Sequence, residues 1–166
     1  MKKKIFLLAV LMFLLVGCEM ANTPTAVVEN LFSKYQKLDE DIKKGIDSVL
    51  DEQNLTDTHR DRYRKLLEKQ YQSLSYEIKE ETIDGESATV TAEIEVIDYH
   101  SAVSDLTFDS SIYTKESFDE EKLNRLESIN DKVTYTLELK LTKDTDGNWR
   151  LNALTNEQIK KIQGMY

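Results

Sequence analysis

Apolar side chains in the first part of the chain recur at intervals of three or four residues, which is the spacing of one face of an α-helix. The first such stretch begins near Pro24, a residue suited to the first turn of a helix, and continues past Leu38. Gly45 is the expected bend or end of this stretch. A second stretch carries apolar side chains from Tyr63 to Tyr71. The pattern therefore predicts two helical segments before residue 75.

The period changes to two after Ser75, which is the alternation expected of half-buried β-strands. Four strands are predicted, around residues 76–80, 88–96, 133–141 and 149–153. Aspartate–glycine pairs, which favour tight hairpin turns, stand between the first two strands at Gly85 and between the last two at Gly147. Thr155 and Gln158 have the spacing of a capping box and predict a short last helix.

Residues 99–131 separate the second strand from the third, and this segment is called the excursion below. Its second half alternates apolar and charged residues in a helical pattern, whereas its first half, Tyr99–Tyr113, is the least regular part of the chain. Antiparallel strands with one apolar face need a covering layer, which the N-terminal helices supply. The sequence thus predicts an α+β fold, with N-terminal helices packed on a four-stranded antiparallel sheet and a short C-terminal helix.

The first eighteen residues have the pattern of a secretory signal peptide. Three lysines precede the apolar run Ile5–Val16, whose 12 residues are fewer than the roughly 20 that a membrane-spanning helix needs. The sequence Leu15-Val16-Gly17-Cys18 resembles the lipobox of bacterial lipoproteins, in which cleavage after the glycine makes the lipid-modified cysteine the new N-terminus. The resemblance implies a signal peptide over 1–17, a lipidated Cys18 with a short tether over 18–25, and a protein anchored to the cell membrane on its extracytoplasmic face.

Composition narrows the possible chemistry further. Cys18 is the single cysteine, so once it is lipidated no thiol remains for disulfides, catalysis or metal binding. The formal charge of the chain is −9, and loss of the three lysines in the leader makes the remainder more acidic. An acidic surface repels nucleic acids, which we therefore exclude as partners. A cationic partner is permitted.

The strand pattern also resembles a known family. The stretch Val133–Lys143, the turn at Gly147 and the strand beginning at Trp149 are similar to those of small surface lipoproteins of low-GC Gram-positive bacteria with an NTF2-like (cystatin-like) domain. The ending Gly164-Met165-Tyr166 resembles that group too. This resemblance implies one domain over 26–166, with a curved, cone-shaped sheet and a pocket between its concave face and a helix. The acid/base sets of the family's enzymes have no residue-by-residue match here.

Asp98 and His100 form the best acid/base pair that the chain offers. Both follow the second predicted strand, and alternate strand residues share one face, so the two side chains could meet at the mouth of a pocket. The competing interpretation is a polar strand end that leads into a loop. His59, near the start of the second helical stretch, is expected to be exposed.

Four aromatic residues in the excursion are the candidate binding surface: Tyr99, Phe108, Tyr113 and Phe118. Aromatic anchors on an irregular loop suit a contact with a partner. The alternative is that they close the open end of the core. Trp149 is expected in the core.

No metal site or cofactor is predicted. Asp144 to Asn148 superficially resembles a calcium loop, but the positions that should carry the remaining carboxylates hold Thr142 and Ala153, so a hairpin turn is favoured. Three functional hypotheses follow: a non-catalytic, lipid-anchored extracytoplasmic domain that binds a protein or small-molecule partner, a small NTF2-like enzyme, and an accessory subunit of an envelope complex whose acidic surface meets a basic partner.

Overall fold

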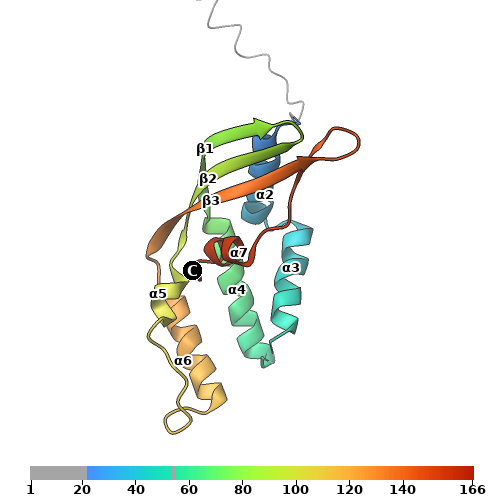
Figure 1. Cartoon of the computed structure of the whole chain (residues 1–166). Helices are drawn as coiled ribbons and strands as arrows, with labels where there is room; N and C mark the ends of the chain where they lie inside the picture. Colours follow the sequence, from blue (N-terminus) through green and yellow to red (C-terminus); the bar gives the residue numbers. More distant parts are fainter. Residues whose placement is uncertain (1–21, 54) are drawn as a thin grey trace, which may run out of the picture.

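The computed structural model describes residues 22–53 and 55–166, so the predicted signal peptide and Cys18 lie outside the described residues. Figure 1 shows N-terminal helices against a curved sheet, which confirms the predicted α+β fold and the short C-terminal helix. In chain order the elements are α2 (Pro24–Lys37), α3 (Glu40–Asp51), α4 (Asp57–Ser73), β1 (Ser75–Asp84), β2 (Ser87–Ile97), α5 (Tyr99–Val103), α6 (Lys115–Ser128), β3 (Lys132–Lys143), β4 (Trp149–Leu151) and α7 (Asn156–Ile162).

The sheet has the order β1-β2-β3-β4, and all of its neighbouring strands are antiparallel. Gly85 and Gly147 adopt positive φ angles of 58° and 80° in the two hairpin turns, as the aspartate–glycine pairs predicted. β4 is shorter than predicted and ends at Leu151. The alternation in β2 is confirmed, because its apolar side chains are buried and its polar ones point to the opposite face.

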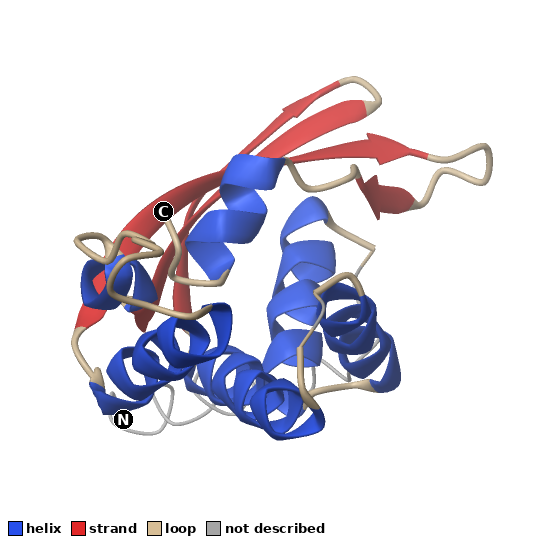
Figure 2. Ribbon diagram, turned by 90° about the horizontal axis from the view of Figure 1, so that it is seen from below, coloured by secondary structure: helices blue, strands red, loops and turns tan. Residues whose placement is uncertain are grey.

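The helices cover the concave face of the sheet (Figure 2). Phe32 of α2 and Leu50 of α3 are buried in one core with Ile94 of β2, Leu139 of β3 and Ile162 of α7. Trp149 belongs to the same core, as predicted. Side chains therefore pack the region beneath the concave face in which the family resemblance implied a pocket.

The first helical stretch breaks at Leu38 rather than at Gly45. Leu38 adopts a left-handed conformation with φ of 50°, and its N–H donates to the carbonyl of Tyr35. Asp39 then begins α3, because its carboxylate accepts the backbone N–H groups of Asp41 and Ile42. Gly45 lies inside α3, where glycine costs only about 1 kcal/mol relative to alanine. The hydrogen bonds that the Asp39 cap provides therefore determine where α2 ends and α3 begins.

The excursion is more regular than predicted at its start. Tyr99–Val103 forms α5, and the irregular part runs from 104 to 114. Thr114 then caps α6 in a reciprocal arrangement with Ser117, so the predicted helix in the second half is confirmed.

The C-terminal segment covers the free edge of β3. Three carbonyl groups of β3 accept hydrogen bonds from it: Glu138 O from Gln158 Nε2 at 2.6 Å, Lys140 O from Asn152 N at 2.9 Å, and Thr136 O from Lys161 Nζ at 3.5 Å. An uncovered edge strand is a template for aggregation. α7 and the turn before it thus protect the sheet as well as its core.

A second junction joins the end of the chain to the end of β2. The amide of Gln70, which is fully buried in α4, donates to the carbonyl of Ile97 and accepts the N–H of the same residue, both at 3.0 Å. The carbonyl of Gly164 accepts the N–H of His100 at 2.7 Å. These bonds fix the point at which the excursion leaves the sheet.

Candidate binding surface

The structure does not assemble Asp98 and His100 into an acid/base pair. β2 ends at Ile97 and α5 begins at Tyr99, so the strand alternation that would align the two side chains does not reach them. The carboxylate of Asp98 caps α5 by accepting the N–H of Ser101 at 3.0 Å. His100 is exposed, and neither residue lines any of the three surface hollows described below. The helix cap replaces the predicted strand end.

Tyr99 belongs to the core and not to the candidate surface. Its side chain is only 3% exposed, and its hydroxyl donates to the carbonyl of Leu66 in α4 at 3.2 Å. Burial raises the pKa of Tyr99 to about 12. For this residue the alternative interpretation, closure of the core, holds.

The other three aromatic residues of the excursion do come together, around Phe118. The ring of Phe108 meets Phe118 edge-on at a centroid distance of 5.3 Å, and the ring of Tyr113 does so at 5.5 Å. Such edge-to-face pairs are favourable beyond the area that they bury. Phe108 is nevertheless 49% exposed, and Ile112 beside it is 70% exposed.

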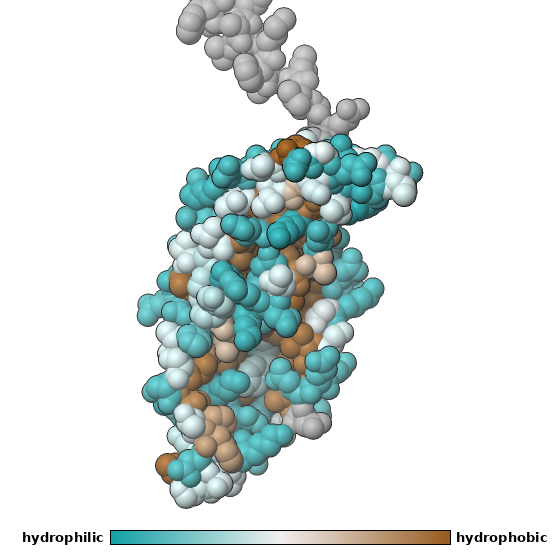
Figure 3. All heavy atoms as spheres, in the orientation of Figure 1, coloured by the Kyte–Doolittle hydropathy of each residue, from teal (hydrophilic) through white to brown (hydrophobic). Residues whose placement is uncertain are grey.

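We call this group the tip; its members are Leu106, Phe108, Ile112, Tyr113 and Phe118. The tip lies where α6 and the loop before it form the lower end of the molecule in Figure 1. Apolar spheres lie among hydrophilic ones at this end in Figure 3. The sequence predicted Phe108, Tyr113 and Phe118 as surface residues but not Ile112. Its apolar side chain among serine and aspartate residues was the signal that could have identified it.

An open hollow of about 630 Å³ lies at the tip, lined in part by Phe108, Ile112 and Asp109. A second hollow, of about 570 Å³, extends toward Asp131 at the end of the excursion. The two hollows share Asp105 and Arg125 as lining residues, so they adjoin one another. We refer to these two adjoining hollows together as the groove; their lining residues extend from the tip to α5 and α6.

The groove carries negative charge. Arg125 is held by Asp105 and by Glu121, each at 2.8 Å, so two carboxylates already surround its guanidinium group. Asp109 accepts hydrogen bonds from the hydroxyl and the backbone N–H of Ser111, and these bonds lower the pKa of its carboxyl group. Asp109 and Asp131 are exposed. The groove thus combines apolar side chains with ionised carboxylates.

A polar network holds α6 against α4 and thereby positions the tip. His59, which was predicted to be exposed, is only 6% exposed because α6 covers it, and its Nε2 lies 3.1 Å from Glu120 Oε2. Arg62 donates to both Glu120 and Glu127 at 2.7 Å. Contacts between α4 and α6 are remote in sequence, so the helical period alone could not show that His59 is covered.

This network should make stability depend on pH. Hydrogen bonds from Arg62 lower the pKa values of Glu127 and Glu120 below the ordinary 4.5. A carboxyl group whose pKa is lower in the folded state stabilises the fold above pH 4.5, and this contribution is lost as the pH falls through the folded-state pKa. We expect Arg62→Met to melt at a lower temperature than the wild type at pH 7, with the difference shrinking as the pH falls below 4.5 and vanishing once the pH is below the folded-state pKa values of both carboxyl groups. Thermal melts across this range check it, and a constant difference would contradict it.

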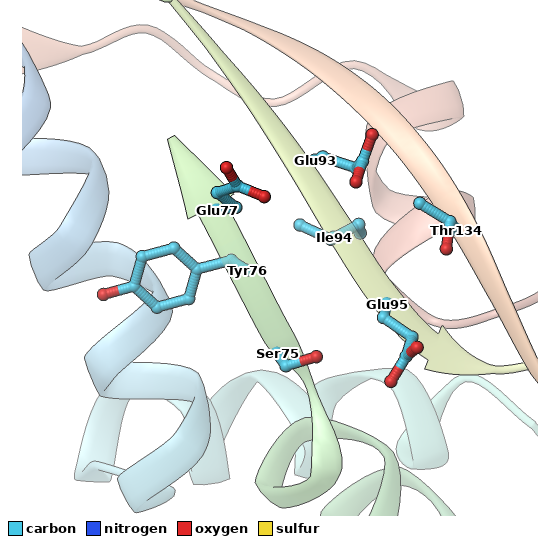
Figure 4. Close-up of a pocket in the computed structure, with 7 residues that line it drawn as sticks. All are labelled: Ser75, Tyr76, Glu77, Glu93, Ile94, Glu95 and Thr134. Atoms are coloured by element: carbon cyan, nitrogen blue, oxygen red, sulfur yellow. The ribbon is translucent and has the colours of Figure 1, made fainter. Parts of the chain in front are cut away.

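A third hollow, of about 280 Å³, lies at the start of β1 (Figure 4). Lys79 lies 2.6 Å from the carboxylate of Glu77 and 3.4 Å from that of Glu93, and Lys132 pairs with Glu95 at 2.8 Å. Tyr76 points away toward α2, where its ring contacts Phe32 at a centroid distance of 4.6 Å. Each carboxylate of this hollow already lies beside a lysine of this chain, with Lys79 shared by two of them, and we do not consider the hollow a binding site.

Two further findings concern residues 22–53 and 55–166. Within these ranges no helix combines the length and the apolar character needed to cross a membrane. Nor do three or more histidine, cysteine, aspartate or glutamate side chains gather there in a way that could hold a metal ion.

Comparison with known proteins yields no family and a distant structural neighbour. No protein-family model matches the chain, and no curated protein matches it. Among solved structures, the chain is similar to the "putative lipoprotein (ycdA)" of Bacillus subtilis subsp. subtilis str. 168, with a TM-score of 0.42 and 15% sequence identity. The similarity covers 77% of this chain and 46% of that chain. This chain therefore spans less than half the length of that protein.

Proposed function

We propose that this chain is a lipid-anchored, extracytoplasmic, non-catalytic binding domain, and that it engages a protein partner through the tip. The observation that carries the proposal is the exposure of Phe108 and Ile112 at the end of the domain opposite to the entry of the chain. Exposed apolar side chains gathered at one end of a domain mark interaction sites in soluble proteins.

The position of the entry point supports an outward-facing tip. Asn22 is fixed beside the β3–β4 turn, where its side chain accepts the N–H of Trp149 at 3.0 Å and donates to the side chain of Asn148 at 3.1 Å. In Figure 1 this turn and α6 lie at opposite ends of the molecule. A domain anchored through Cys18 would therefore hold the tip away from its own membrane.

The tip is also organised before any partner arrives. The rings of Phe108 and Tyr113 contact the ring of Phe118 edge-on. Thr114, which follows Tyr113 in the chain, caps the start of α6. A surface that is already ordered loses less conformational entropy on binding. This favours recognition by a fixed surface over folding of the loop on contact.

We also propose that the domain has no catalytic activity and that its fold is NTF2-like. Asp98 caps a helix and His100 is exposed, so the acid/base pair on which the enzyme hypothesis depends is not formed. The NTF2-like assignment is supported by the curved sheet with helices on its concave face. Core side chains occupy that face, which leaves the outer surface for function.

Site-specific crosslinking in intact membranes tests the proposal. We expect a photo-reactive benzoylphenylalanine in place of Ile112 to form a discrete crosslinked product with a partner, because this position lies within the tip. The matched control is the same group in place of Ile83, which is 53% exposed on the β1–β2 hairpin at the other end. Equal product patterns at the two positions would contradict the proposal.

A further inference from the structure

We infer that the occupant of the groove is a cationic segment of a partner protein, which places an apolar side chain against Phe108 and Ile112 and basic side chains beside Asp109 and Asp131. This inference rests on the proposed function and specifies its partner. It follows from the way in which the apolar and charged groups of the groove are distributed.

The apolar contact lies at one end of the groove. Phe108 and Ile112 line the hollow at the tip, and about half or more of each side chain is exposed. The ring of Phe108 is held by Phe118, so it offers a fixed face to an incoming aliphatic side chain. Apolar anchors that become buried in an interface supply much of its binding energy.

The charges that flank this contact are predominantly negative. Asp109 lies within the tip hollow, and its hydrogen bonds with Ser111 favour the ionised carboxylate without neutralising it. Asp131 lines the adjoining hollow. Arg125, the basic residue common to both hollows, is already paired with Asp105 and Glu121. The groove therefore attracts cations, and its complement is a segment that carries lysine or arginine.

The hollow at the start of β1 shows the contrast within the same molecule. There each of the three glutamates lies within 3.4 Å of a lysine ammonium group of this chain, with Lys79 shared between Glu77 and Glu93 and Lys132 beside Glu95. At Asp109 the hydrogen-bond donors are a hydroxyl and a backbone N–H, both neutral. The difference selects the groove, rather than the acidic surface as a whole, as the site for a cationic partner.

The same charges argue against two other occupants. An anionic lipid surface would be repelled by Asp109 beside the apolar residues and by Asp131 in the adjoining hollow. A second copy of this chain, docked tip to tip, would bring Asp109 toward its own counterpart, and like charges at an interface are destabilising. A positively charged protein segment meets neither obstacle.

Binding of designed peptides to the full chain in phosphatidylcholine nanodiscs tests the inference. One fluorescently labelled peptide carries two leucines, with lysine and glycine residues between them. Its counterpart is identical except that every lysine is replaced by glutamate. We expect fluorescence anisotropy to detect binding of the lysine peptide only, and raised salt should weaken it. Phe108→Ala and Asp109→Asn should each weaken it about tenfold. The matched controls Ile83→Ala and Asp84→Asn, on the distant hairpin, should leave it unchanged.

The outcomes separate this inference from the proposed function. Equal binding of the two peptides, or equal affinity of Asp109→Asn and Asp84→Asn, would overturn the cationic partner. If Phe108→Ala still weakened binding in that case, the tip would stand as the binding surface. Absence of binding, or binding that no tip variant weakens, would also overturn the cationic partner. The crosslinking at positions 112 and 83 would then decide the proposed function by itself.

Discussion

Replacement of Gly164 by alanine should destabilise the fold by about 2–5 kcal/mol, the combined cost of a left-handed backbone and of overpacking. Gly164 has a φ of 67°, and an added Cβ would lie 1.9 Å from the carbonyl oxygen of Ile97 and 2.5 Å from Nε2 of Gln70. One of these neighbours is backbone of the central sheet, and the other is a fully buried amide. Neither can move without breaking the junction between α4, β2 and the C-terminus. Urea unfolding of the wild type and of Gly164→Ala measures the difference in their free energies of unfolding.

Gly147→Ala is the matched control for this substitution. Gly147 also has a positive φ, of 80°, but a Cβ there would meet nothing within 4 Å. It should lose only the backbone contribution, about 1–2 kcal/mol. The difference between the two variants therefore isolates the steric contact of the C-terminal turn. Equal losses in the two variants would show that this contact does not constrain the fold.

Gln70→Met should destabilise the protein by about 2–6 kcal/mol, because it leaves two buried backbone groups without partners at about 1–3 kcal/mol each. The groups are the N–H and C=O of Ile97, and both of them bond to the amide of Gln70 at 3.0 Å. Methionine is close in shape to glutamine, so the effect reports the hydrogen bonds more than the packing. Urea unfolding gives the loss of stability, and faster hydrogen exchange at the Ile97 amide locates it.

Gln36→Met provides the comparison for Gln70→Met. Gln36 is partly buried and donates a single bond, at 2.9 Å, to the carbonyl of Leu74. Its loss should cost about 1 kcal/mol, the usual net value of one such bond. A loss at Gln70 no greater than at Gln36 would mean that the amide of Gln70 does not anchor β2.

Local pattern was sufficient for most of the fold. The alternation in β2 predicted its buried face because each side chain of a strand points opposite to its neighbour, whatever packs against it. The turns at Gly85 and Gly147 were predictable because the left-handed conformation is a property of the turn itself. Gly45 misled because its low helix propensity is a smaller effect than the cap that Asp39 provides.

The features that sequence could not give all depend on long-range contacts. His59 is buried by α6, Tyr99 by α4, and Gln70 bonds with the end of β2, partners that are 27 to 61 positions away. Hydrophobic periodicity describes one element at a time and says nothing about which elements meet. A prediction from periodicity therefore assigns polar and aromatic residues that complete a core to the surface.

The candidate site was predicted in part, for the same reason. Phe108, Tyr113 and Phe118 are close in sequence, so a compact loop was enough to bring them together. Tyr99 was wrongly grouped with them, because its hydroxyl bonds with α4 instead. The groove toward Asp131 exists only because α5 packs beside α6, and no local pattern announces that contact.

The central claim is that the tip is the surface through which this domain meets its partner. Its most direct test compares the crosslinking yield at position 112 with that at position 83 in intact membranes. Both positions are tested in the otherwise wild-type chain and in a chain that also carries Phe108→Ala. We predict a discrete product at position 112, a lower yield of it in Phe108→Ala, and no such product at position 83. A product that forms equally at both positions, or one that Phe108→Ala leaves unchanged, would contradict the claim.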